Sequence, residues 1–277
     1  MRIDGLIKYY DFKEMFEIKN SAAFTVFESF LSSATNWTNL ETSHSYNNGK
    51  VFSGRINVWF EPFVKRQNLK QNVADIHRFF KNIETIPGVK INYSLTDYVL
   101  NLFSLRQIYY VMCGVDFRSD VTKSRLKFWF LVQNFPKKMA AIFKIHGVVD
   151  EVAQYYQTAN GEYTLFGVEL SFAGETRFKL YPYFTQDNMY KLYDTFDPKI
   201  NSLIKKSDKV WITYDKGLNK VLYFQPKNMN AIIEQLGIDD VSAINEKYNV
   251  QGYKLFCISF LEKEILQDNP TKINLYC

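Results

Sequence analysis

Pairs of predicted β-strands joined by short turns are the feature of this sequence that most restricts its fold. Strands predicted near residues 163–172 and 176–183 are separated only by residues 173–175, and strands near 210–214 and 220–225 are almost as close. Turns of this length allow only antiparallel pairing. A parallel sheet, which needs one long crossover for each strand, is therefore disfavoured.

Predicted helices alternate with the strand pairs. Apolar spacing near 3.6 residues predicts helices at residues 10–33, 72–86, 96–104, 186–205, 228–236 and 241–248, and a helical stretch that begins at Pro136. Further strands are predicted near residues 40–46, 51–60, 108–118, 125–133 and 253–261. This order favours the α+β class, with a closed antiparallel β-barrel of about ten strands surrounded by helices, because closure removes the sheet edges. We expect one domain over residues 1–277.

Composition points to a binding role for some of the aromatic residues. The chain has 277 residues, of which 17% are aromatic, more than a packed core needs, so some are expected to line a cavity. The net charge of +5 is modest and spread along the chain, which suits a small anionic ligand better than a nucleic acid.

The sequence lacks the marks of export and of several common catalytic sites. Cys113, Cys257 and Cys277 have no metal-ligand spacing and form an odd set, which favours a reducing cytoplasm. The apolar runs are too short to cross a membrane, and the first residues do not resemble a signal peptide. An Asp-rich magnesium motif, a glycine-rich phosphate loop and a serine elbow are all missing, so no protein-held metal site is expected.

A short pattern of the form basic, any, Lys, any, aromatic recurs on the predicted strands. Its two full copies are Arg125, Lys127, Trp129 and Arg177, Lys179, Tyr181, and its partial copies are Arg55, Asn57, Trp59 and Lys220, Leu222, Phe224. Because strand side chains alternate, the cations of each full copy share one face, while apolar neighbours occupy the other. Cations that converge in a cavity repel one another unless a polyanion binds there, and a diphosphate meets that need. The alternative is a sheet whose polar face lies in water.

Several motifs resemble the cyanobactin peptide prenyltransferases, relatives of the soluble ABBA-type aromatic prenyltransferases. They are the stretches 53–55 (SGR), 87–92 (PGVKIN), 114–118 (GVDFR) and 167–172 (GVELSF), the last leading into Arg177, Lys179 and Tyr181. They occur in the family's order, and the last third of the chain matches only in its alternation of strands and helices.

The resemblance implies an enzyme that moves a dimethylallyl or geranyl group from its diphosphate to a side chain of a cyclic or linear peptide, with magnesium accompanying the diphosphate. It assigns diphosphate binding to Arg55, Arg125, Lys127, Arg177, Lys179, Tyr181 and Lys220. Allylic cations are stabilised by aromatic ring faces, and Trp59, Trp129 and Tyr223 are the candidates for that wall. The protein is expected to be a cytoplasmic monomer.

One departure from the family concerns the general base. Family members that act on tyrosine carry a glutamate before the glycine of the first turn, where this chain has Asn47. Either Glu41 or His44 takes that role, or the acceptor needs no strong base, which favours tryptophan over tyrosine. Arginine, histidine and chain termini remain open as acceptors. So do two other functions: a prenyltransferase for a free indole or phenol, and a carrier of an acidic or lipidic ligand that performs no chemistry.

Overall fold

A single hydrogen-bonded antiparallel sheet runs through the chain. The computed structural model describes residues 2–14, 21–47, 50–60, 66–146, 150–215, 218–237, 239–250, 252–268 and 270–277. Eleven strands follow one another in the order β6-β5-β4-β3-β2-β1-β11-β10-β9-β8-β7. Within the described ranges, none of the helices has the length and apolar character needed to span a bilayer.

The chain forms two compact units that share this sheet. The first comprises Met1–Thr42, Ser53–Val148 and Glu162–Leu180, and the second comprises Ser43–Phe52, Val149–Gly161 and Tyr181–Cys277. Strands β1 (Trp37–Asn47) and β2 (Lys50–Phe60) run from one unit into the other. That the chain is one domain over residues 1–277 stays a prediction.

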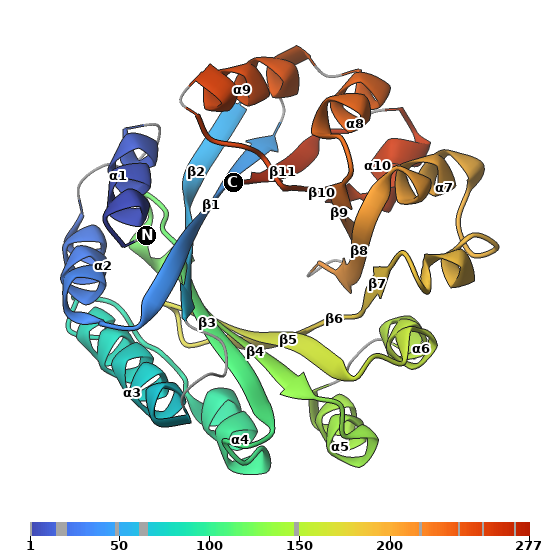
Figure 1. Ribbon diagram of the computed structural model, residues 1–277. Helices are drawn as coiled ribbons and strands as arrows, with labels where there is room; N and C mark the ends of the chain where they lie inside the picture. Colours follow the sequence, from blue (N-terminus) through green and yellow to red (C-terminus); the bar gives the residue numbers. More distant parts are fainter. Residues whose placement is uncertain are drawn as a thin grey trace. The chain divides into compact units, whose positions relative to one another are not determined.

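In the first unit, helices lie along one face of the strands (Figure 1). The helices are α1 (Arg2–Lys13), α2 (Ala22–Ser33), α3 (Arg66–Ile83), α4 (Ser94–Leu102) and α5 (Pro136–His146), with a 3-10 turn at Val121–Lys123. The remaining strands are β3 (Ile108–Asp116), β4 (Arg125–Gln133), β5 (Tyr163–Ser171) and β6 (Thr176–Tyr181), whose last residue is counted with the second unit.

The core of the first unit follows the two-residue period of its strands. On β4, Leu126, Phe128 and Phe130 are fully buried, and the ring of Phe128 packs edge-on against Phe80 of α3 with centroids 5.9 Å apart. Arg125 and the other alternate residues of β4 occupy the opposite face. This alternation leaves one face of the sheet free for polar and aromatic side chains.

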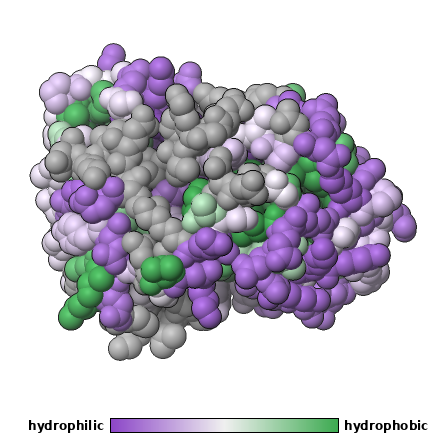
Figure 2. All heavy atoms as spheres, turned by 90° about the horizontal axis from the view of Figure 1, so that it is seen from above, coloured by the Kyte–Doolittle hydropathy of each residue, from purple (hydrophilic) through white to green (hydrophobic). Residues whose placement is uncertain are grey.

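The second unit has the same alternation of helices and strands. Its elements are α6 (Asp150–Ala159), β7 (Tyr183–Thr185), a 3-10 turn at Met189–Leu192, α7 (Pro198–Lys205), β8 (Ser207–Tyr214), β9 (Lys220–Pro226), α8 (Met229–Leu236), α9 (Asp239–Val250), β10 (Cys257–Leu261), α10 (Glu262–Leu266) and β11 (Lys272–Tyr276). Its core contains Ile212, Leu222, Phe224 and Ile258, all fully buried. The described residues on the face of the molecule shown in Figure 2 are mostly hydrophilic, with smaller hydrophobic patches between them, as expected when the large apolar side chains pack inside.

Two predicted elements differ from the structure, and the structure adds a strand that was not predicted. The helix predicted at residues 10–33 is wrong as one element, because α1 ends at Lys13 and Ser21 caps the start of α2 by accepting a hydrogen bond from the Phe24 N–H at 3.3 Å. The helix predicted at 186–205 is a 3-10 turn followed by α7, whose first residue is Pro198 and whose N-cap, Asp197, accepts a hydrogen bond from the Lys199 N–H at 2.8 Å. Strand β11 was not predicted, although it connects β1 to β10.

Candidate functional site

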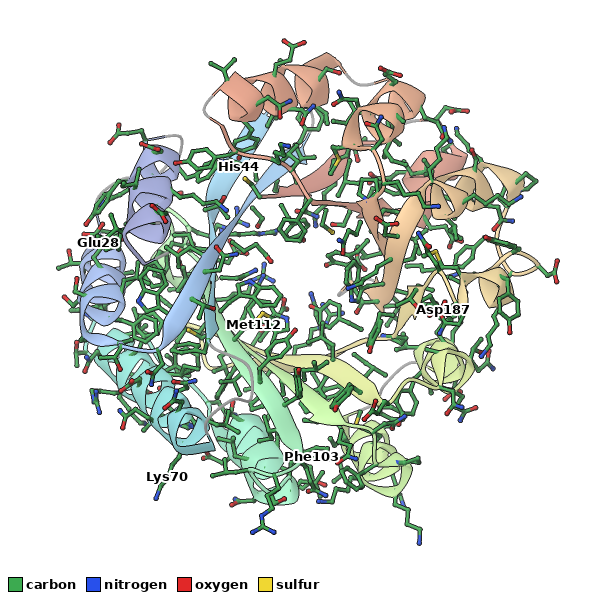
Figure 3. The ribbon with its side chains drawn as sticks, viewed as in Figure 1. Glu28, His44, Lys70, Phe103, Met112 and Asp187 are labelled. Atoms are coloured by element: carbon green, nitrogen blue, oxygen red, sulfur yellow. The ribbon has the colours of Figure 1, made fainter. Side chains whose placement is uncertain are left out.

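Three rows of cross-strand neighbours form one face of the sheet in the first unit, here called the site face. Residues that pair directly across antiparallel strands point to the same side of the sheet. The rows are Arg55, Asp116, Arg125, Ser171, then Asn57, Gly114, Lys127, Glu169, and then Trp59, Met112, Trp129, Gly167. Figure 3 shows Met112 on the face of β3 that is turned away from α3 and α4. The site face therefore changes from charged to aromatic along the strands.

Two guanidinium groups hold the carboxylate of Asp116. The Nε atom of Arg55 lies 3.2 Å from Oδ2, and an Nη atom of Arg118 lies 2.9 Å from Oδ1. Asp116 is only 1% exposed. Burial raises the pKa of this carboxyl, but the positive charges of Arg55, Lys127 and Arg118 outweigh burial and lower the pKa to about 2. Asp116 is therefore ionised at neutral pH and fixes the two arginines.

Glu169, in the next row of the site face, is likewise a buried carboxylate that holds two cations. Its Oε1 lies 2.9 Å from Nζ of Lys179, and its Oε2 lies 3.7 Å from a guanidinium nitrogen of Arg125. Burial again opposes ionisation, yet the charges of Lys179 and Lys127 hold the pKa of Glu169 well below its usual range. Lys179 sits on β6 two residues after Arg177, and burial lowers its pKa, with Arg177 adding to the effect.

Lys127 lies between these two pairs and differs from its neighbours. Within the described part of the chain it forms no ion pair, and its Nζ lies 5.5 Å from the centroid of the Trp129 ring. Burial, followed by the like charge of Arg55, lowers the pKa of Lys127 to about 8, although Glu169 and Asp116 oppose this. Lys127 is the cation of the site face with the most to gain from a bound anion.

The site face carries more positive than negative charge. Among the described residues, six cations lie around three carboxylates, an excess of three positive charges when Glu41 is ionised. The cations are Arg55, Arg118, Arg125, Lys127, Arg177 and Lys179, and the carboxylates are Asp116, Glu169 and Glu41. Such an excess in a partly buried place is unfavourable unless an anion of matching charge enters. Arginine forks and lysine ammonium groups are the donors that phosphate oxygens accept.

Trp129 lies flat across two glycines of neighbouring strands. A Cβ atom built on Gly167 would lie 2.7 Å from its Cδ1, and one built on Gly114 would lie 2.8 Å from its Cζ3. These glycines therefore leave room for the indole, which is 8% exposed. Trp59 follows in the same row, and its ring centroid lies 5.7 Å from that of Tyr110.

Glu41 approaches the same face from β1. Asn57 donates a hydrogen bond from its amide to Oε1 of Glu41, which is 8% exposed. Burial raises the pKa of Glu41, opposed by this hydrogen bond and by the charges of Lys8 and Lys127. A carboxylate with a raised pKa beside the cations has the chemical character of a proton acceptor.

The other two residues considered for the base belong to the second unit. His44 is fully buried and hydrogen-bonded to the hydroxyl of Tyr248 on α9, and it is three residues from Glu41, so the two point to opposite faces of β1. Asn47 pairs with Lys272 of β11, and its side chain lies outside the described residues.

The second unit also contains the remaining predicted binding residues. Lys220 shares the buried face of β9 with Leu222 and forms ion pairs with Glu151 at 2.9 Å and Glu262 at 3.1 Å. Burial lowers the pKa of Lys220, but the hydrogen bond to Glu151 and the nearby acidic groups outweigh burial and raise this pKa. Its charge is thus matched by acidic partners within its own unit.

An uncharged row lies on the opposite face of the second unit. It consists of Tyr183, Trp211, Tyr223, Ser259, Asn274 and Ser45. Asn274 donates a hydrogen bond to Ser259 at 3.0 Å, and the ring of Tyr223 lies edge-on to that of Tyr181 with centroids 6.0 Å apart. The row offers ring faces, hydroxyl groups and an amide.

The site face does not provide a ligand set for magnesium. Among the described residues no three His, Cys, Asp or Glu side chains are grouped to hold a metal ion. Asp116 and Glu169 are each occupied by cations, whereas magnesium prefers several free oxygen ligands. The donor set of the protein therefore does not fit a resident magnesium ion.

Four residues belong to the site although the sequence pattern did not indicate them as site residues: Met112, Asp116, Arg118 and Glu169. A signal for the two carboxylates exists in the repeated tripeptides Gly114-Val115-Asp116 and Gly167-Val168-Glu169. In each tripeptide the acidic residue is two positions after the glycine and hence lies on the same face of the strand as the glycine. The two tripeptides therefore predict carboxylates beside the space that the glycines leave.

Comparison with known proteins gives one family and one fold. The sequence profile described as "Family of unknown function (DUF5838)" matches residues 6–277. No curated protein matches the chain.

Two solved structures of 6-dimethylallyltryptophan synthases are similar to this chain in fold. The crystal structure of 6-dimethylallyltryptophan synthase from Micromonospora olivasterospora in complex with DMASPP and Trp superposes with a TM-score of 0.57 at 14% identity, covering 86% of this chain and 80% of that one. A 6-dimethylallyl tryptophan synthase gives a TM-score of 0.55 at 13% identity, covering 86% and 79%. These likenesses confirm the predicted fold class, the α+β barrel of the ABBA-type prenyltransferases. The closer resemblance to the cyanobactin branch stays a prediction.

Proposed function

The chain belongs to this family of unknown function, and we propose its activity from the residues of the site face. The protein transfers an isoprenyl group from an isoprenyl diphosphate to the side chain of a tryptophan or tyrosine in a peptide. The observation that carries the proposal is the sequence of rows, in which an excess of cations is followed directly by Trp59, Met112 and Trp129. An isoprenyl diphosphate has the same order of an anionic head and an apolar tail. The similar structures, one of which holds DMASPP and Trp, support this class of reaction.

The cations of the site face would promote departure of the diphosphate. The bond between C1 of the isoprenyl group and the diphosphate oxygen breaks, and its electron pair stays on the diphosphate. Arg55, Lys127 and Lys179 stabilise the charge that develops there. The flat indole of Trp129 offers its negative ring face to the allylic cation.

An aromatic carbon of the acceptor then bonds to C1, and the proton on that carbon must leave. Glu41 is the proposed acceptor of that proton, because its buried carboxylate lies beside Asn57 and its pKa is raised. His44 is not proposed for this role, since it is buried against Tyr248 on the other face of β1.

The resemblance of the stretches 53–55, 87–92, 114–118 and 167–172 to the cyanobactin peptide prenyltransferases favours a peptide acceptor over a free amino acid. One of the similar structures, in contrast, holds free tryptophan. Free tryptophan is the second candidate and belongs in the same experiment.

The test is mass spectrometry of acceptors incubated with the protein, magnesium and either dimethylallyl or geranyl diphosphate. The panel contains cyclic and linear peptides with Trp, Tyr, Arg or His, together with free tryptophan and a simple phenol. We expect one isoprenyl unit to be added to a Trp or Tyr peptide, and Lys127→Ala or Lys179→Ala to abolish the addition. Addition to free tryptophan alone would replace the peptide proposal, and tight donor binding without any product would indicate a carrier.

A further inference from the structure

Lys179 is paired with a carboxylate in the structure, although the proposed function requires it to face a diphosphate. Its Nζ lies 2.9 Å from Oε1 of Glu169, and the two side chains are 15% and 8% exposed. Lys127, its neighbour across the site face, has no such partner among the described residues. Before the donor binds, Lys179 is therefore ion-paired with Glu169, whereas Lys127 has no ion-pair partner among the described residues.

We propose that Glu169 and the diphosphate compete for Lys179 in an exchange of ion-pair partners. When the donor binds, the ammonium group of Lys179 turns from Glu169 to the diphosphate. After transfer, Glu169 binds Lys179 again, and the pyrophosphate product is released. This proposal rests on the proposed function and makes Glu169 a positioning residue that acts through Lys179. It assigns to Glu169 control over the release of product.

The need for such a residue follows from the charge of the two ligands. Transfer removes the isoprenyl carbon from its oxygen and leaves the electron pair there, so pyrophosphate is more negative than the ester from which it came. A site with an excess of cations therefore holds the product more tightly than the substrate. A carboxylate beside one of those cations weakens the hold on both anions and thereby allows turnover.

Geometry identifies Lys179 as the cation that can exchange. Lysine carries a compact ammonium group on four rotatable bonds, so its Nζ can turn between two acceptors. Arg55 has no need to turn, because a guanidinium group has several donors and Asp116 lies beside its Nε. Glu169 keeps a second cation, Arg125, when Lys179 leaves it, at 3.7 Å.

Calorimetric titration with inorganic pyrophosphate tests the proposal without requiring turnover. The variants are Glu169→Gln, Lys179→Gln and the double variant, with Glu84→Gln as the matched control. Glu84 also pairs with a lysine, Lys81, at 2.8 Å in the same unit, but at the end of α3 and away from the site face, with side chains 26% and 62% exposed. We expect Glu169→Gln to bind pyrophosphate about tenfold more tightly than the parent, which corresponds to about 1.4 kcal/mol.

Lys179→Gln and the double variant should bind equally weakly, because Glu169 acts through the lysine. The Glu84→Gln control should bind as the parent does. In steady-state prenyl transfer, Glu169→Gln should show a lower kcat and stronger inhibition by pyrophosphate. A purely structural role for Glu169 predicts the reverse, namely weaker binding.

Each result has a distinct meaning. A folded Glu169→Gln variant that binds pyrophosphate as the parent does, or more weakly, overturns the exchange while leaving the proposed function intact. A parent protein that binds neither pyrophosphate nor the donor overturns the proposed function. If Glu169→Gln does not fold, Glu169→Asp replaces it, because the shorter side chain draws the carboxylate away from Lys179. The Asp variant should bind pyrophosphate more tightly than the parent, and unchanged binding overturns the exchange.

Discussion

The indole of Trp129 lies directly over Gly167, so close that a Cβ atom on that glycine would come within 2.7 Å of the ring. Gly114 stands in the same relation to the other edge of the indole. Neither glycine has the positive φ that would require glycine for the backbone. Gly167 leaves space for the flat indole beside the cations, and Gly114 leaves space for both the indole and the side chain of Asn57.

Gly167→Ala should destabilise the protein and lower prenyl transfer. The added methyl group forces Trp129 away from the sheet, and overpacking of this kind costs about 1 to 3 kcal/mol. Denaturant unfolding measures the loss of stability, and product formation measures the loss of activity. Trp129→Phe in the same chain should recover much of the stability, since the smaller ring clears the methyl group. A Gly167→Ala protein as stable as the parent would show that the indole has room to move.

Lys127→Gln should weaken pyrophosphate and donor binding by about tenfold to a hundredfold. The lost interaction is a charged hydrogen bond, worth about 1.5 to 3 kcal/mol. Lys220→Gln is the matched control, because Lys220 is also partly buried but is paired with Glu151 and Glu262 in the second unit. It should reduce stability and leave pyrophosphate affinity unchanged. Equal losses in the two variants would argue against a special role for Lys127.

Pyrophosphate affinity should fall as pH rises from about 7 to 9. Lys127 has a pKa of about 8, so it loses its proton across this range in the free protein and no longer attracts the anion. Lys127→Arg should remove the fall, since arginine stays charged. The same group acts oppositely on folding. Its pKa is lower in the folded than in the unfolded chain, so the unfolded chain binds more protons above pH 8 and this group adds stability as pH rises. Titrations at several pH values check the first effect, and urea unfolding checks the second.

Glu41→Gln should lower turnover at least a hundredfold with little change in donor affinity. Removing a general base costs about 10² to 10⁴ in rate, whereas the cations around Asp116 are untouched. Single-turnover kinetics and donor titration separate the two quantities. The pH profile of the parent should show activity rising as Glu41 loses its proton, with a midpoint above the usual carboxyl range because burial raises its pKa. Full activity in the variant would mean that another group, or water, removes the proton.

Chelation of magnesium should weaken donor binding by less than about tenfold. The site face already supplies three unbalanced positive charges, and two of its carboxylates, Asp116 and Glu169, are held by Arg55 and Lys179. Titration of a donor analogue with EDTA and with magnesium measures the difference. A complete loss of binding in EDTA would mean that the diphosphate enters only as its magnesium complex.

Strand alternation made much of the site predictable. The period of two predicted that Arg125, Lys127 and Trp129 share one face. The structure has them there, on the same face as Arg55 and Trp59 of β2, with β3 between the two strands. The same period of two grouped Lys220 with Leu222 and Phe224 as a partial copy of the pattern. In the structure these three residues share a face of β9 on which Leu222 and Phe224 are buried. A pattern of alternation does not state which of the two faces meets the helices.

What escaped prediction depends on contacts between distant segments. Glu169 and Lys179 meet only because β5 and β6 are neighbours, and single short motifs do not report such pairs. The caps at Ser21 and Asp197 divide stretches whose apolar spacing is continuous, so periodicity alone joined them. Strand β11 is five residues long, too short to show alternation, and is fixed by its pairing with β1 and β10.

The pairing of Ser43 with Tyr276 joins β1 to β11, the two strands of the sheet that are farthest apart in the sequence. On the ribosome, β2, which lies beside β1 on one side, follows at once, but β1 must wait for all the strands from β3 to β10 before β11, its partner on the other side, emerges. Contacts of such sequence separation form slowly, and an unpaired strand edge can meanwhile associate with other chains. Folding of this protein should therefore be limited by the arrival of β11, and truncation before Lys272 should lead to aggregation during expression.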